Sequence, residues 1–160
     1  MGTVYVEPPL AISVRQPWAW AIIHAGKDIE NRGWGPSNPG LKVRGPVCIH
    51  AAKGMTRIEY ETARDFMAII GVECPAPVDL LRSGILGAVE VVDVVKESDS
   101  PWFFGPNGIV LANPVPLDFT PVAGQLGFFE WRWRPRVNVP EPAKWMKAEF
   151  SVEKTQRCLI

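Results

Sequence analysis

Residues 13–34, SVRQPWAWAIIHAGKDIENRGW, place a short apolar segment between two groups of polar residues. Pro17 suits the first turn of a helix, where the N–H group that proline lacks would have no partner. Apolar residues then recur at helical spacing, and Gly26 is typical of the position just beyond a helix end. Residues 28–32, DIENR, alternate as a strand does. The stretch therefore predicts a helix followed directly by a short strand.

The charged and polar residues around this helix allow two interpretations. Arg15 and Gln16 precede the helix, where free N–H groups and a guanidinium together could hold an anion such as phosphate. Lys27 follows the helix, and Glu30 and Arg32 share one face of the strand. A lysine after a helix end is also favourable for the helix dipole alone, and neighbours of opposite charge often form ion pairs. The spacing leaves open whether these residues pair their charges or line a cleft.

The rest of the chain has mainly the pattern of short strands separated by glycine- and proline-rich turns. The strongest strand signal is ILGAVEVVDVV, residues 85–95. Thr56 and Glu59 form a capping box, which predicts a helix that ends at Gly71. The apolar stripe expected on this helix consists of Ile58, Ala63, Phe66, Met67 and Ile70. Further strands are expected at residues 10–14, 46–52, 108–113, 115–119 and 125–133, and one or two helical turns at 77–84.

These elements predict an α+β fold, mainly β, in which helices flank a small β-barrel. At 160 residues the chain is long enough for one domain with its own core. We expect that domain at residues 1–133 and a C-terminal extension at 134–160, packed on the domain or trailing from it. A short helix around 142–150 is one arrangement of this extension, and a loosely packed tail is the other.

Composition and charge restrict the class of protein. A hydrophobic fraction of 47% and a charged fraction of 21% are typical of a soluble globular protein. No apolar run approaches the roughly 18 residues of a membrane helix, and MGTVYVEPPL, residues 1–10, lacks the pattern of a signal peptide. We therefore expect a cytoplasmic protein without a membrane partner. The formal net charge is zero, but residues 11–53 carry six Lys or Arg and only two acidic residues, which favours an anionic partner.

Standard catalytic and metal-binding motifs are absent from the sequence. There is no nucleophile elbow, P-loop, zinc-protease helix or dinucleotide fingerprint. Cys48, Cys74 and Cys158 are far apart, and none of them forms a CxxC pair. We expect reduced thiols, no metal site and no cofactor.

Residues 13–32, SVRQPWAWAIIHAGKDIENR, resemble the start of ASCH domains, a branch of the PUA-like superfamily. The ASCH motif G-x-K-x-x-E-x-R is matched without a gap by Gly26, Lys27, Glu30 and Arg32. SVRQPWA, GPVCIHAAK, GILGAVEVVDV and GQLGFFEW are also similar to segments of the larger bacterial and phage members, in the same order, so that the resemblance covers about residues 10–131. It implies a PUA-like β-barrel with a cleft beside the first helix. It also implies that the partner is RNA, another single-stranded nucleic acid, or a free nucleoside or nucleotide, with a modified base among the candidates.

The resemblance, together with the chemistry of base recognition, predicts the residues of such a cleft. A site of this kind needs cations for phosphate, polar groups that read a base edge, and an aromatic ring for stacking. The cations are Arg15, Lys27 and Arg32, the edge-reading groups are Gln16 and Glu30, and the aromatic ring is Trp18 or Trp34. His50 and Lys53, at the end of the next strand, are candidates for the far wall, although a buried, hydrogen-bonded histidine is an ordinary alternative for His50. Trp102, Phe103 and Phe104 form either a second aromatic rim or plain core packing.

Two other functions stay open at this stage. Some small ASCH proteins are amidohydrolases that act on N4-acylated cytidines with a lysine, a threonine and a glutamate, and ribonuclease activity is also suggested in the family. Here Lys27 matches the lysine, whereas Glu30 stands in place of the threonine, so Lys27 and Glu30 would act as a proton-transfer pair. The other function is a protein–protein adaptor, for which EWRWRPR, residues 130–136, is the candidate segment. The oligomeric state is not indicated by the sequence.

Overall fold

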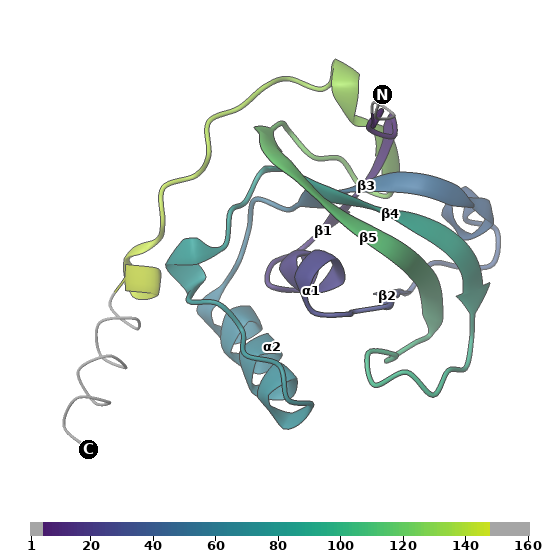
Figure 1. Ribbon diagram of the computed structural model, residues 1–160, viewed down its shortest axis with the longest axis horizontal. Coiled ribbons are helices and arrows are strands. Elements are labelled where there is room, and N and C mark those ends of the chain that lie inside the picture. The colour runs from purple at the N-terminus through teal and green to yellow at the C-terminus, as the bar shows by residue number, and fades with distance from the viewer. Residues whose placement is uncertain (1–4, 148–160) are drawn as a thin grey trace.

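A computed structural model describes residues 5–147 of the chain and confirms the α+β class with a curled, barrel-like sheet (Figure 1). The strands are β1 (Leu10–Val14), β2 (Ile29–Arg32), β3 (Gly45–Ala51), β4 (Gly84–Val95), β5 (Asn107–Pro121) and β6 (Phe128–Glu130). The helices are α1 (Trp18–His24) and α2 (Arg57–Ile69), with short 3-10 helices at Pro39–Lys42, Pro77–Asp79 and Trp131–Trp133. The helix–strand pair predicted from residues 13–34 is therefore present as α1 and β2.

The six strands form one sheet in the order β2-β5-β4-β3-β1-β6. All neighbouring strands are antiparallel except β1 and β3, which run parallel with Ser13 opposite His50 and Val14 opposite Ala51. Because two parallel strands end at the same edge of a sheet, the residues that follow β1 and β3 come close together. Arg15 and Lys53 are therefore brought to one side of the molecule.

The sheet curls so far that its distant strands approach each other. β2 lies at one edge, and β1 is next to the other edge. Nevertheless, Arg32 Nη2 on β2 donates a hydrogen bond of 2.7 Å to the backbone oxygen of Ser13 on β1. Arg32 thus bridges the open side of the barrel with its side chain.

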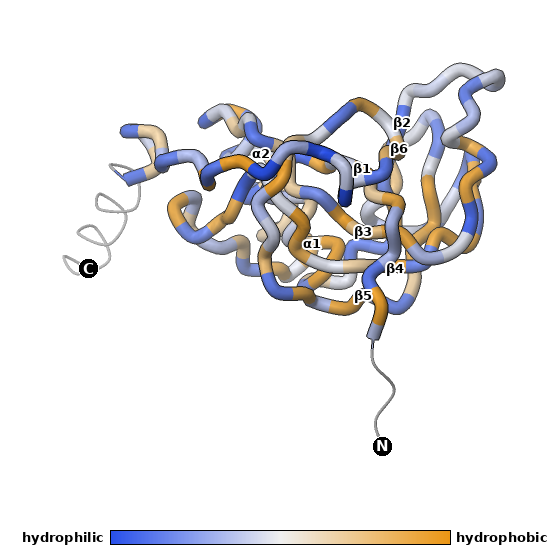
Figure 2. Tube along the Cα trace, turned by 90° about the horizontal axis from the view of Figure 1, so that it is seen from above, coloured by the Kyte–Doolittle hydropathy of each residue, from blue (hydrophilic) through white to orange (hydrophobic). Residues whose placement is uncertain are grey.

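Helix α1 lies inside the curl of β3, β4 and β5 (Figure 1). Its buried face, which includes Ala19, Ile22 and Ile23, packs on apolar residues of the strands, and hydrophobic residues concentrate there (Figure 2). Gly26 has a φ of +74°, a left-handed conformation that glycine adopts without steric cost, and it turns the chain from α1 into β2. The chain can therefore place Lys27 directly beneath the first residues of β2.

Helix α2 begins as the capping box predicts, because the Thr56 side chain accepts a hydrogen bond from the Glu59 N–H group. The predicted apolar stripe is only partly correct. Met67 is buried, but the Ile58 side chain is 76% exposed. Ile58 lies in the first turn, beyond the surface that α2 packs against, and Tyr60 supplies the buried contact there instead.

The structure corrects the expectation of two separate strands at residues 108–113 and 115–119. One long strand, β5, covers both. The register shifts between Ala88, opposite Val115, and Glu90, opposite Ala112, so that β5 holds one extra residue at this point. Asn113 within this bulge has a φ of +53°. The Asn-Pro step that indicates a turn therefore bends the strand without ending it.

The described part of the C-terminal extension, residues 134–147, runs back over the domain towards the 3-10 helix at Pro77–Asp79 (Figure 1). Residues 144–147 are helical, and Met146 is buried against Met55, Tyr60 and Leu80. This part is packed on the domain. Residues 148–150 of the expected helix around 142–150, and Cys158, lie outside the described residues.

Candidate functional site

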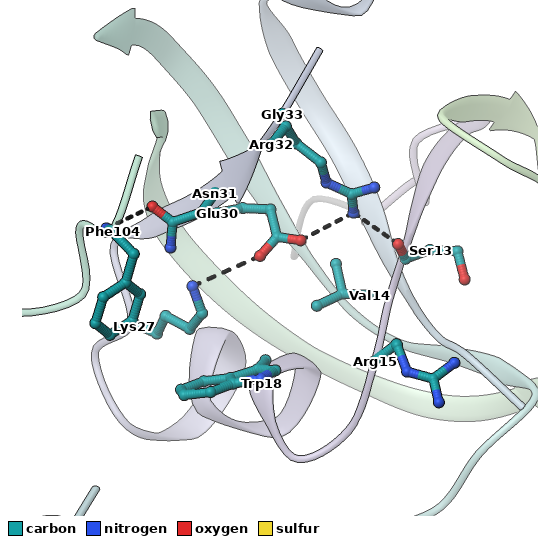
Figure 3. Close-up of a pocket in the computed structure, with 10 residues that line it drawn as sticks. All are labelled: Ser13, Val14, Arg15, Trp18, Lys27, Glu30, Asn31, Arg32, Gly33 and Phe104. Carbon is teal, nitrogen blue, oxygen red and sulfur yellow. Dashed lines mark hydrogen bonds and ion pairs between the residues drawn. The ribbon is translucent and has the colours of Figure 1, made fainter. Parts of the chain in front are cut away.

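A pocket of about 390 Å³ opens between the end of β1, helix α1 and strand β2, and we call it the Trp18 pocket (Figure 3). The loop that carries Phe104 closes one side of it. The pocket is lined by Ser13, Val14, Arg15, Trp18, Lys27, Glu30, Asn31, Arg32, Gly33 and Phe104. Five of the predicted site residues, including the ASCH-like lysine, glutamate and arginine, therefore line one pocket.

Lys27, Glu30 and Arg32 form a row of alternating charge along the pocket (Figure 3). The Lys27 Nζ atom lies 3.6 Å from Glu30 Oε1, and Arg32 Nη2 lies 2.9 Å from Glu30 Oε2. Strand alternation places Glu30 and Arg32 on the same face of β2, and the turn at Gly26 brings Lys27 to them. A carboxylate has about four lone-pair sites, so Glu30 keeps acceptor capacity for a ligand.

Lys27 is held as a buried cation. It is only 3% exposed, and Nζ donates a hydrogen bond to the backbone oxygen of Ile29. Nζ also lies 5.7 Å from the ring centre of Trp18 and 5.9 Å from that of Trp102, both within cation–π range. Burial lowers the pKa of Lys27 below its ordinary value, and the nearby Glu30 carboxylate opposes this shift. The ammonium therefore depends on Glu30 for compensation.

Aromatic rings form the apolar part of the pocket. Trp18 contacts Phe66 and Phe104, with ring centres 6.0 and 6.4 Å away. Phe104 is 59% exposed, whereas Trp102 is buried. Of the predicted second aromatic group, Trp102 belongs to the core and Phe104 forms the rim of the pocket.

Asn31 was not among the predicted site residues, and it fixes the position of that rim. Its Oδ1 atom accepts hydrogen bonds from the N–H groups of Phe104, at 2.8 Å, and Gly105, at 3.1 Å. Its Nδ2 atom donates to the Trp102 backbone oxygen at 2.9 Å. The only sequence signal was its place between Glu30 and Arg32, because its partners are about 70 residues away along the chain.

Two of the predicted residues, Gln16 and Trp34, lie outside the Trp18 pocket. Gln16 is 3% exposed and lies outside the pocket, because its Oε1 atom accepts from the Trp20 N–H group and its Nε2 atom donates to the Leu81 oxygen. The ring centre of Trp34 lies 5.3 Å from the guanidinium carbon of Arg32, and the ring packs on Phe128.

Arg15 does reach the pocket wall, but it points away from the Lys27–Glu30 pair (Figure 3). Two hydrogen bonds tie its guanidinium to the Glu59 carboxylate of α2, one of them 2.7 Å long. Since α1 has only seven residues and Gln16 is buried, the anion site expected at the start of this helix is not formed in the predicted way.

His50 and Lys53 line a second pocket of about 490 Å³, which we call the Lys53 pocket. It shares Ser13, Arg15 and Arg32 with the Trp18 pocket and is closed by the loop of residues 124–127. The predicted single cleft is therefore two adjacent pockets with a common wall. Neither pocket is lined by Gln16 or Trp34.

His50 is a buried, hydrogen-bonded histidine. Its Nε2 atom lies 2.7 Å from the Val122 oxygen, which can only accept, so Nε2 carries the proton and Nδ1 accepts from the Ser13 hydroxyl at 3.0 Å. Burial lowers the pKa of His50, the hydrogen bond to the Val122 oxygen opposes this shift, and the charge of Arg134 adds to it. The pair therefore anchors β1 to β3.

This arrangement predicts a loss of stability in mild acid. His50 has a lower pKa in the folded state than the ordinary value of 6.5, so the unfolded chain takes up a proton first. The contribution of His50 to the free energy of unfolding is therefore fully present above about pH 6.5. Below that pH the free energy of unfolding falls by up to about 1.4 kcal/mol per pH unit. Urea unfolding between pH 7 and 5 measures this slope. His50→Gln should flatten it, His24→Gln at an exposed position should not, and an equal slope in all three proteins would contradict the assignment.

Comparison with known proteins supports the family indicated by the sequence. The family model of the ASCH domain matches residues 12–111, more than half of the chain. This range includes α1, β2 and the whole Lys27–Glu30–Arg32 row. No curated protein matches the chain. Within residues 5–147 there is no helix long and apolar enough to cross a membrane.

Proposed function

The chain belongs to the ASCH domain family, a PUA-like family generally associated with RNA, and from this premise we propose that its Trp18 pocket binds one base of a single-stranded RNA. The observation that carries the proposal is the Lys27–Glu30–Arg32 row, which lies beside exposed aromatic surface in an open pocket. A row sealed in the core would serve stability alone. Here the Glu30 carboxylate lines the pocket together with Trp18 and Phe104.

The chemistry of the row suits the polar edge of a base. Glu30 accepts hydrogen bonds from N–H groups, and the Lys27 ammonium donates to a carbonyl oxygen. Guanine and uracil carry an N–H group directly beside a carbonyl, and cytosine carries both groups farther apart. Adenine has no carbonyl. We therefore expect adenine to bind most weakly when oligonucleotides that differ in one base are compared.

The aromatic rim provides a test of base stacking. Phe104→Ala is expected to weaken the binding of a labelled single-stranded hexaribonucleotide about tenfold, because stacking on one aromatic ring contributes about 1–3 kcal/mol per base. Phe104 is exposed, so the substitution should leave the fold intact. Fluorescence anisotropy gives the dissociation constant. Trp133→Ala removes an aromatic ring that is 84% exposed outside both pockets, and equal affinities of the two variants would reject the proposal.

A second candidate function is hydrolysis of an N4-acylated cytidine, favoured by the lowered pKa of Lys27 and its contact with Glu30. A lysine with a lowered pKa next to a carboxylate can transfer a proton between water and a leaving amine. The residues of the Trp18 pocket include no threonine, so water activated by Glu30 would be the nucleophile. Release of acetate from N4-acetylcytidine tests this candidate. Activity that Lys27→Ala leaves unchanged would exclude this pocket from the reaction.

A further inference from the structure

We propose that the Lys53 pocket is a phosphate subsite, which holds a backbone phosphodiester of the same strand whose base occupies the Trp18 pocket. The ligand class is then an oligonucleotide, for which a free nucleoside is an incomplete substitute. This inference rests on the proposed function for the base and adds a second site with a different chemistry.

The two pockets adjoin each other. Ser13, Arg15 and Arg32 line both, so a ligand that leaves the Trp18 pocket along this wall enters the Lys53 pocket. The wall exists because the parallel strands β1 and β3 end on the same side of the molecule, and because Arg32 of β2 reaches across to the Ser13 oxygen of β1. In every nucleotide the base and the phosphate are joined to the same sugar, so two adjoining pockets can hold one each.

The two pockets differ in the charge of the residues that line them. The Lys53 pocket is lined by three cations, Arg15, Arg32 and Lys53, and by no aspartate or glutamate. The Trp18 pocket, in contrast, contains Glu30. Within the described residues, Lys53 is exposed and forms no ion pair, so its ammonium is available to an anion. A base edge with N–H donors thus fits the first pocket, and a phosphodiester fits the second.

The loop of residues 124–127 gives the Lys53 pocket an uncharged wall. Residues 124–127 pass so close to His50 that a Cβ atom on Gly124 would lie 2.6 Å from the histidine Cε1 atom. Glycine is therefore required there, and the loop is seated against the neutral His50 without adding a charged side chain. Arg134 fixes the same loop by donating to the Gly124 oxygen at 2.8 Å.

Arg15 adds an adjustable contribution. Glu59 holds its guanidinium in an exposed ion pair and neutralises part of its charge. Removing the Glu59 charge should release Arg15 towards the phosphate. Glu59→Gln is therefore expected to increase RNA affinity about two- to fivefold, the size of one exposed ion pair. Glu59 lines neither pocket, so it does not itself contact a ligand in either site.

The test uses the full chain and two hexanucleotides of the same sequence. One has a normal phosphodiester backbone, and the other has an uncharged methylphosphonate backbone. We expect Lys53→Gln to weaken binding of the normal strand about five- to tenfold and to reduce the salt slope of log K by about 1. The uncharged strand should bind the variant and the wild-type protein equally. Lys42→Gln, at an exposed lysine outside both pockets, should leave the affinities and the slope unchanged.

The outcomes separate the two proposals. A Phe104→Ala effect without a Lys53→Gln effect would overturn the phosphate subsite and keep the base site. A Lys53→Gln effect without a Phe104→Ala effect would keep the phosphate subsite and reject the base pocket. Failure of the wild-type protein to bind the normal strand would overturn both.

Discussion

Replacing Glu30 by glutamine is expected to lower the free energy of unfolding by about 3 kcal/mol at pH 7, because it leaves a buried charge without its partner. Glu30 compensates two cations, Lys27 at 3.6 Å and Arg32 at 2.9 Å. Lys27 is only 3% exposed, so water replaces little of the compensation that the carboxylate gives its charge. The amide keeps the size of the side chain, and the loss therefore reports charge and not packing.

The pH dependence of this loss has a definite sign. Burial already holds the pKa of Lys27 below 10.5 in the folded protein, and Glu30 opposes the shift. Without Glu30 the folded-state pKa decreases further, while the unfolded-state pKa stays near its ordinary value. Between the two values the unfolded chain binds more protons, so stability increases with pH. The deficit of Glu30→Gln should thus shrink as the pH rises from 7 towards about 10.

Urea unfolding of matched variants measures this effect. Glu61→Gln, in the exposed Arg57–Glu61 pair of α2, should cost less than about 1 kcal/mol. Adding Lys27→Met to Glu30→Gln should recover most of the loss, because the more deeply buried of the two uncompensated cations is then gone. A Glu30→Gln loss as small as that of the surface control would show that Lys27 does not depend on Glu30.

The second large effect concerns binding. Lys27→Met is expected to weaken single-stranded RNA binding about 100-fold, or about 2.7 kcal/mol, because a charge-assisted hydrogen bond to the base is lost in a desolvated site. Methionine is apolar and flexible, so it can fill the space between Trp18 and Trp102. Arg32 still compensates the Glu30 carboxylate, and the variant should remain folded.

Anisotropy titrations at one fixed salt concentration provide the measurement. The control is Lys42→Met, which removes the same charge from an exposed position. A cooperative unfolding transition close to that of the wild-type protein shows that the Lys27→Met variant is folded. If the two lysine variants bound RNA equally well, Lys27 would contribute only its net charge.

Local patterns in the sequence predicted the elements that position the site. The end of the helix before Gly26 and the alternation of DIENR place Lys27, Glu30 and Arg32 together. Both patterns span fewer than ten residues. The capping box of α2 is equally local and is confirmed. Such features depend on backbone preferences and periodicity, which a single sequence displays.

The features that the sequence did not predict depend on distant pairing. The parallel register of β1 and β3 separates the expected cleft into two pockets, and nothing near Arg15 or Lys53 indicates that pairing. Gln16 was predicted to read a base, but its partner is the Leu81 oxygen, 65 residues away. Residues 108–113 and 115–119 were predicted as two strands, because the bulge of β5 against β4 is a property of two strands together.

The most direct test of the base pocket is a crystal structure of the protein with a single-stranded trinucleotide at a concentration that saturates it in solution. We expect one base to lie against Trp18 and Phe104, with its polar edge about 2.7–3.2 Å from the Glu30 carboxylate and the Lys27 ammonium. A trinucleotide bound elsewhere on the protein, with no base in the Trp18 pocket, would contradict the account.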